Sequence, residues 1–181
     1  MPAMFCLWYI FSPLISSFVS IVIYYPVEYL THGLVSNVYS AGLEVEAVVK
    51  LVSGDYGNLR VPRGQTAEVV LTARPMIYGY GIPLFATLLF VFYKNEVTVV
   101  KVIVCFFILL MGVCFGVAME LMKNIFLALD KSITESISIA QWKLELIAIG
   151  YQFSTLILPA MLPLSLWILL NKNYFSDVFE S

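Results

Sequence analysis

The sequence has few of the residue types that carry most enzyme chemistry. Its 181 residues include one histidine and three cysteines, and charged residues make up only 12% of the chain. A single histidine excludes a metal site built from several imidazoles, and a formal charge of −2 gives no basis for binding nucleic acid. The cysteines at positions 6, 105 and 114 lie in apolar stretches, which favours packing as small hydrophobic side chains over disulfide bonds. We therefore predict no catalytic, metal-binding or cofactor-binding residues.

Apolar residues, in contrast, are abundant. They make up 61% of the chain, and the mean hydropathy is +0.91. A soluble domain carries about 25% charged residues, so this composition is that of an integral membrane protein. Segments of about 20 apolar residues can cross a bilayer. Four such segments predict a membrane α-helical bundle of about four transmembrane helices: Ala3–Tyr25, Met76–Tyr93, Val97–Met119 and Leu144–Leu170.

Residues 40–74 differ from the rest of the chain, because their apolar residues alternate with polar ones. From Leu43 to Val52 every second residue is apolar, and the stretch Ala67–Ala73 alternates in the same way. Period-two alternation predicts half-buried strands. With a short strand at Leu59–Val61, the segment is expected to form a small three-stranded antiparallel sheet between the first and second helices. We therefore divide the chain into a first helix with an amphipathic extension over Val27–Tyr39 (1–39), the β insert (40–74) and a three-helix region (75–181).

Charge does not fix the orientation of these segments in the membrane. With the N-terminus in the cytoplasm, three lysines fall inside and the other seven basic residues outside, against the positive-inside rule. Folded loops translocate largely regardless of charge, which weakens the rule here. We expect the β insert on the non-cytoplasmic side, which is the periplasm for a bacterial inner-membrane protein.

A few polar side chains lie in or near the predicted spans. Intramembrane ionisable groups are candidates for function by default, although each of these lies near a span boundary where water could reach it. One hypothesis makes the protein a membrane enzyme that uses Glu120, Lys123 or Glu145. The complete set of candidate polar residues is Glu28, His32, Glu120, Lys123, Glu145 and Gln152.

The sequence Tyr78-Gly79-Tyr80-Gly81 is similar to the T-V-G-Y-G filter of potassium channels. A filter needs a preceding pore helix, whereas here a predicted strand and Arg74-Pro75 precede the motif. Glycines that allow helices to pack closely explain the motif better. A second hypothesis, a small transporter or channel subunit, would use this motif and the helix break expected at Pro159 and Pro163.

The segment Arg74–Leu84 resembles the N-P-L-x-Y-G-Y-G-L-P-L pattern of exosortase H-associated membrane proteins, with Arg74 in place of asparagine. The stretch from Gln141 to Trp167 is similar to that family's last span. The resemblance implies a non-enzymatic accessory in the lipid bilayer whose partner is an exosortase-like protein-sorting enzyme. The residues expected to contact that partner are Arg74, Pro75, Tyr78, Gly79, Tyr80 and Gly81.

Overall fold

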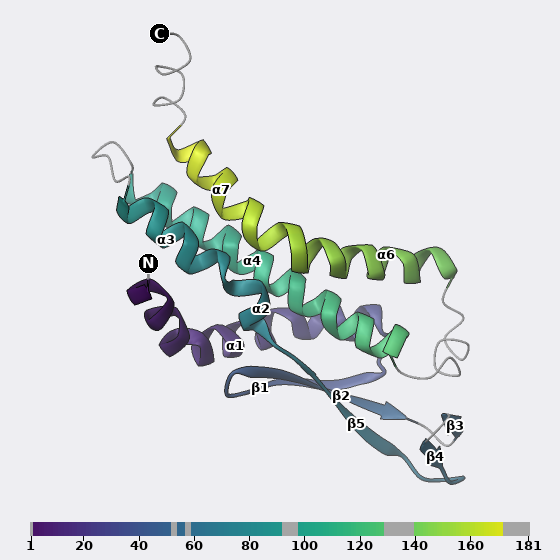
Figure 1. The fold of residues 1–181 in the computed structure, drawn as a ribbon. Helices are drawn as coiled ribbons and strands as arrows, with labels where there is room; N and C mark the ends of the chain where they lie inside the picture. Colours follow the sequence, from purple (N-terminus) through teal and green to yellow (C-terminus); the bar gives the residue numbers. More distant parts are fainter. Residues whose placement is uncertain (1, 52–53, 57–58, 92–97, 129–139, 172–181) are drawn as a thin grey trace.

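The computed structural model describes residues 2–51, 54–56, 59–91, 98–128 and 140–171. Long helices form a bundle, and a small sheet lies along one half of it (Figure 1). The helical elements are α1 (Pro2–Leu30), α2 (Pro75–Gly79), α3 (Gly81–Val91), α4 (Val99–Lys123), η1 (Asn124–Ala128), α6 (Gln141–Gln152), η2 (Phe153–Ile157) and α7 (Leu158–Leu170). The strands are β1 (Val35–Ala41), β2 (Glu44–Leu51), β3 (Gly54–Tyr56), β4 (Leu59–Val61) and β5 (Ala67–Ala73).

Three helices of the described chain are long and apolar enough to cross a membrane: Ala3–Leu30, Val99–Leu127 and Gln141–Leu170. They correspond to the first, third and fourth predicted spans. The second predicted span is a shorter apolar helix, Pro75–Val91, which changes from α2 to α3 at Tyr80. At 1.5 Å per residue it extends about 25 Å, less than the hydrocarbon thickness of about 30 Å. The predicted helical membrane bundle is confirmed, whereas the count of four spans is not.

Helix α1 extends beyond the predicted boundary at Tyr25 and ends at Leu30. The Thr31 hydroxyl donates to the carbonyl of Val27, and the Gly33 N–H donates to the carbonyl of Glu28. His32 takes a positive φ of 52° between them, as is typical of a helix that ends in a left-handed residue. The only histidine of the sequence is thus an exposed helix-terminal residue.

The predicted β insert is present, but its strands differ from the prediction. The main sheet is antiparallel with the order β1-β2-β5. Strands β2 and β5 match the predicted alternating segments, and their pairing aligns Val45 with Ala73 and Leu51 with Ala67. The predicted strand at Leu59–Val61 lies outside this sheet, because it pairs with Gly54–Tyr56 in a separate two-stranded ribbon.

Strand β1 was missed: it begins within the segment predicted to be amphipathic, Val27–Tyr39, and ends two residues beyond it at Ala41. The register shifts between Val35 and Asn37, so a bulge at this point places both Val35 and Val38 on the buried face. Apolar residues three positions apart lack the period of two that is typical of a strand, which explains why this strand was not predicted. Gly42, at φ 66°, begins the two-residue turn to β2.

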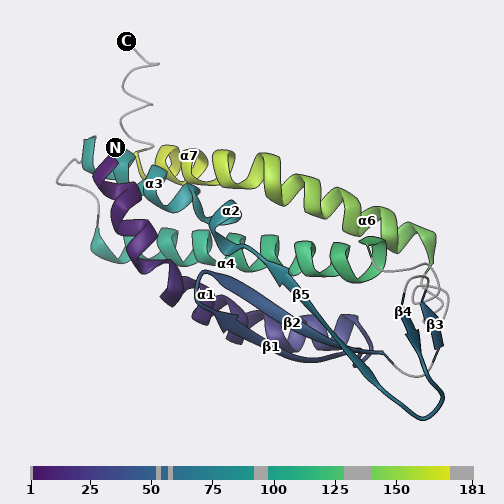
Figure 2. The same ribbon diagram turned by 60° about the horizontal axis from the view of Figure 1, so that its bottom comes forward.

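The hydrophobic core falls into two clusters. The larger one joins the inner face of the sheet to α1, to the second half of α4 and to α6, with Val45, Val117 and Ile147 among its members. The smaller one contains Phe85, Cys105, Leu109 and Leu166, from α3, α4 and α7. We call the first part of the molecule the sheet half and the second the helical half. Figure 2 shows the strands against α1 and α4 in the sheet half.

The three long helices are longer than a bilayer requires. With 28 to 30 residues each, they extend about 42 to 45 Å, against about 30 Å of hydrocarbon. Apart from Lys101, in the first turn of α4, their charges gather at the sheet end, because none occurs in α1 before Glu28 or in the last helix after Glu145. In α4 no charge lies between Lys101 and Glu120. The charged ends of the helices beside the sheet are therefore the parts that we expect to extend past the hydrocarbon.

Candidate functional site: the junction of sheet and bundle

Arg74 connects the sheet to the bundle. It follows β5 directly and precedes Pro75, the first residue of α2. Its Nε donates to Glu44 Oε1 of β2 at 2.8 Å, and its backbone N–H donates to Glu120 Oε2 of α4 at 3.2 Å. One residue thus binds a neighbouring strand through its side chain and a helix distant in sequence through its backbone.

The first residue of η1, which continues α4, satisfies a second backbone group at this end of β5. Asn124 Nδ2 donates to the carbonyl of Thr72 at 3.3 Å. Glu120 and Asn124 are one helical turn apart, about 6 Å, and two residues of a strand span about 6.7 Å. The two side chains therefore reach the C=O of Thr72 and the N–H of Arg74 on the outer edge of β5. They take the place of a further strand there, which protects the edge from pairing with another chain.

Tyr78 lies beneath this contact and is only 2% exposed. Its hydroxyl is within hydrogen-bonding reach of the Glu120 carboxylate and of the Thr155 hydroxyl in η2. Its ring packs on Gly116 of α4, where an added Cβ would lie 2.3 Å from Tyr78 Cδ1. Tyr78 thus connects α2 to both α4 and the last helix.

The last helix is widened at η2 beside this tyrosine. Pro159 cannot donate a backbone hydrogen bond, and its ring crowds the carbonyl one turn earlier, so the preceding turn opens. The hydroxyls of Ser154 and Thr155 both donate to the carbonyl of Tyr151, at 2.9 and 2.7 Å. The ring of Tyr151 in turn lies 4.1 Å below Lys123 Nζ, which places a cation over its face.

The two glycines of the Tyr-Gly-Tyr-Gly motif pack against other helices of this chain. A Cβ on Gly79 would lie 3.3 Å from the Trp8 ring of α1. A Cβ on Gly81 would lie 2.6 Å from the carbonyl oxygen of Pro159. That oxygen lacks its usual donor one turn later, because residue 163 is also proline. The prediction that the glycines allow close helix packing is confirmed, and the helices concerned belong to the same molecule.

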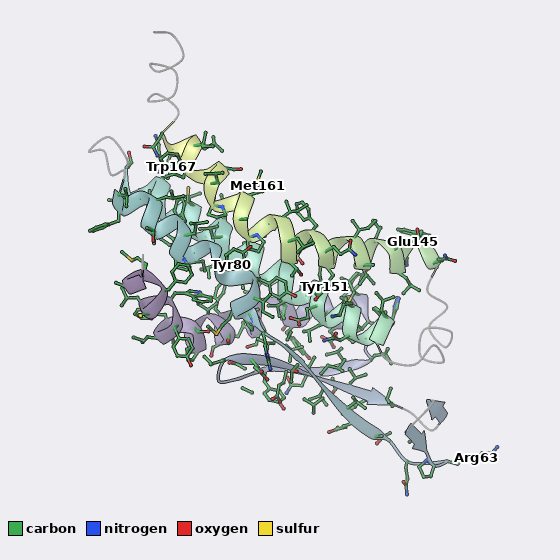
Figure 3. All side chains as sticks on the ribbon, in the orientation of Figure 1. Arg63, Tyr80, Glu145, Tyr151, Met161 and Trp167 are labelled. Carbon is green, nitrogen blue, oxygen red and sulfur yellow. The ribbon has the colours of Figure 1, made fainter. Side chains whose placement is uncertain are left out.

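The six residues predicted to contact a partner divide into two groups. Pro75, Tyr78, Gly79 and Gly81 are buried inside the chain. Arg74 is exposed and Tyr80 is half-buried, and Ile77, one turn before Tyr80, is 42% exposed. Figure 3 shows Tyr80 on the segment between α2 and α3. The outward-facing part of the motif is therefore Arg74, Ile77 and Tyr80.

The candidate polar residues are only partly brought together. Glu120 and Lys123 belong to the junction, whereas Glu28 lies within hydrogen-bonding reach of the Tyr24 hydroxyl on α1. Glu145 lies near the free end of α6 (Figure 3) and accepts a bond from Gln141 at 3.3 Å. Gln152 is exposed. Sequence reasoning missed Glu44, Asn124, Tyr151 and Thr155, whose roles depend on contacts between distant segments.

The contacts at the junction connect the sheet to the helices of the same chain. Across residues 2–51, 54–56, 59–91, 98–128 and 140–171, no group of three or more His, Cys, Asp or Glu side chains is placed to hold a metal ion. The charged groups of the junction are instead paired with one another, with backbone groups or with an aromatic ring.

Comparison with known proteins gives one match. No curated protein and no solved structure matches the chain. One family model, described as exosortase H-associated membrane protein, matches residues 1–174, which is nearly the whole chain and includes both the β insert and the junction. The chain belongs to the family of exosortase H-associated membrane proteins.

Proposed function

We propose that the protein is a non-enzymatic accessory that binds exosortase H within the bacterial inner membrane. The observation that carries this proposal is the family match over residues 1–174, which covers all the described elements. The family description gives an association with exosortase H, and the apolar helices make a membrane-embedded partner physically reasonable. Glu120 accepts a hydrogen bond from the Arg74 N–H, and Lys123 lies over the Tyr151 ring. These contacts within the chain support a structural role for both charges.

The proposed contact surface is the outward-facing part of the motif, formed by Arg74, Ile77 and Tyr80. Tyrosine and arginine are enriched among residues that dominate binding energy at interfaces, and Ile77 adds exposed apolar area. These residues lie where β5 leads into α2, so a partner bound there would contact the sheet and the bundle together.

Co-purification of tagged exosortase H with variants of this protein tests the proposal. We expect Tyr80→Ala combined with Ile77→Ala to reduce recovery of the complex at least tenfold. Tyr9→Ala is the matched control, because Tyr9 is an exposed tyrosine of α1 outside the motif. Circular dichroism would establish that the variants are folded. Equal recovery of wild type and the double variant would contradict this contact surface, and failure of the wild-type protein to co-purify would contradict the function.

We also propose that Pro75–Val91 serves as a fourth, short span and that the sheet lies in the periplasm. The N-terminus, the end of α3, the start of α4 and the end of α7 gather at one end of the bundle, away from the sheet (Figure 1). Reporter fusions after Arg63, at the tip of the β4–β5 turn, and after Asn171 should therefore report opposite sides of the membrane. The same side for both would contradict this topology.

A further inference from the structure

A pocket of about 520 Å³ opens at the sheet end of the bundle, outside the junction. It lies between the end of α1, the last turns of α4 with η1, and the first turns of α6. Its interior is apolar and is formed by Met119, Met122, Phe126 and Ile147. The volume is in the range of pockets that enclose small ligands, about 300 to 1,000 Å³. Neither the packing of the two cores nor the proposed partner contact uses this space.

Lys143 gives the rim of the pocket a positive charge. Among the residues that the structure describes, Lys143 and His32 line the pocket, and no aspartate or glutamate does. Described acidic residues close in sequence to the lining have other partners. Glu120, next to Met119, accepts from the Arg74 N–H, Glu28 lies within reach of Tyr24, and Glu145 is bonded to Gln141. A lysine ammonium and an imidazole N–H both donate hydrogen bonds, and phosphate oxygens accept them. The polar side of the pocket is thus complementary to an anionic group.

The position of the pocket relative to the membrane adds a second argument. It lies at the charged ends of the long helices, which we expect to extend past the hydrocarbon, and exposed Tyr29 and Trp142 line it beside Lys143. Tyrosine, tryptophan and lysine are the residues that anchor proteins at the headgroup level. An apolar interior next to a cationic rim at that depth matches a molecule with a hydrocarbon tail and a phosphate head.

We propose that this pocket binds an anionic phospholipid of the surrounding bilayer. One acyl chain lies among Met119, Met122, Phe126 and Ile147, and the phosphate receives hydrogen bonds from Lys143 and His32. Met side chains adapt readily to a flexible chain, because they have three rotatable bonds and a polarizable sulfur. The bound lipid would fill the space between α1, α4 and α6 at the end of the bundle that carries the sheet.

Native mass spectrometry of the purified full-length protein tests this proposal with two lipids that have the same acyl chains, phosphatidylglycerol and phosphatidylcholine. For the wild type we expect one phosphatidylglycerol bound at least fivefold more tightly than phosphatidylcholine. Lys143→Gln should remove the preference between headgroups. Lys101→Gln is its matched control, since Lys101 is an exposed lysine in the first turn of α4 at the opposite end of the bundle.

A second variant tests the apolar interior without disturbing the core. Leu146 lines the pocket but is 56% exposed, so Leu146→Trp should fill the space and abolish binding of both lipids. Ile149→Trp is the control, because Ile149 is 62% exposed on the same helix and does not line the pocket. Equal binding of the two lipids to the wild type, or binding that Leu146→Trp leaves unchanged, would overturn the proposal. Neither measurement requires exosortase H, so the two proposals fail independently.

Discussion

The two halves of this molecule are held together by different forces. In the sheet half, Val45, Ala47 and Val49 are fully buried beside strands that carry charged residues on their outer face. Removal of apolar surface from water stabilises such a core. In the helical half, Phe85 is fully buried, yet large apolar side chains on the outside of α3, α4 and α7 are exposed: Phe90, Phe107 and Leu169. Lipid is as apolar as these side chains, so close packing rather than exclusion of water has to hold the helices together. Glycine contacts therefore matter most where helices meet.

The strongest test of close packing is Gly116→Ala, at the boundary between the halves. The new Cβ would lie 2.3 Å from Cδ1 and 2.5 Å from Cγ of the buried Tyr78 ring. These ring atoms are only one or two bonds from the Cβ of Tyr78, so rotation of the side chain cannot carry them far from Gly116. We therefore expect about 3 kcal/mol of destabilisation or loss of the folded protein. Thermal unfolding in detergent measures this effect.

Gly150→Ala is the matched control for that substitution. The new Cβ would lie 2.8 Å from Met119 Sδ, which belongs to a flexible side chain that can shift. We expect a loss below about 1 kcal/mol. Equal destabilisation by Gly116→Ala and Gly150→Ala would show that rigidity of the neighbour does not decide the cost.

Leu51→Ala and Phe85→Ala compare the two cores directly. Leu51 is 2% exposed and Phe85 is fully buried. Truncation of a buried leucine in a water-facing domain costs about 2 to 5 kcal/mol, and we expect about 3 for Leu51→Ala. The cost of Phe85→Ala should come from lost contacts alone, including the edge-to-face pair with Phe106 at 5.3 Å, and be smaller, about 2 kcal/mol.

Hydrogen exchange followed by mass spectrometry locates each effect. Leu51→Ala should raise exchange in β1, β2 and β5 and leave α7 protected, whereas Phe85→Ala should raise exchange in α3 and α7. A uniform increase over both halves in either variant would mean that the two cores unfold as one unit.

The third prediction concerns the contact that joins the halves. Glu120→Ala removes the acceptor for the Arg74 N–H, and we expect a loss of about 1 to 3 kcal/mol, with faster proteolysis of the sheet. Glu120→Gln keeps a side-chain oxygen in place and should retain most of the stability. If the two variants are equally unstable, charge rather than hydrogen bonding holds β5 to α4.

The smallest expected effect lies on the exposed face of the sheet. The Tyr39 hydroxyl donates a hydrogen bond to Glu46. This bond is the largest cause, and partial desolvation the next, of a pKa of Tyr39 that is raised above its ordinary value of 10.0. A raised pKa in the folded state means that the bond contributes fully below about pH 10 and is lost as the pH rises through the folded-state value. Stability measured from pH 8 to 12 should therefore fall more for the wild type than for Tyr39→Phe. Parallel curves would contradict the bond.

The sequence predicted those elements whose patterns are regular. Strands β2 and β5 alternate strictly, and the long helices are uniformly apolar, so their existence and approximate bounds followed from periodicity. Strand β1 was missed because the bulge after Val35 changes its apolar spacing from two to three. The junction could not be predicted, since Arg74 and Glu120 are 46 residues apart and their contact depends on how β5 lies against α4. The family resemblance, which rests on local motifs, was confirmed.

The dependence of β5 on α4 has a consequence for biosynthesis. Strands β1, β2 and β5 are complete at Ala73, but the side chain of Glu120 is synthesised 46 residues after Arg74. At about 5 to 20 residues per second, the ribosome needs about 2 to 9 seconds for that interval. During this time the C-terminal edge of β5 has no helix to bond it and can pair with another nascent chain. Membrane insertion of α4 is thus the step that ends this vulnerable period, and slow insertion would lower the yield of folded protein rather than its final stability.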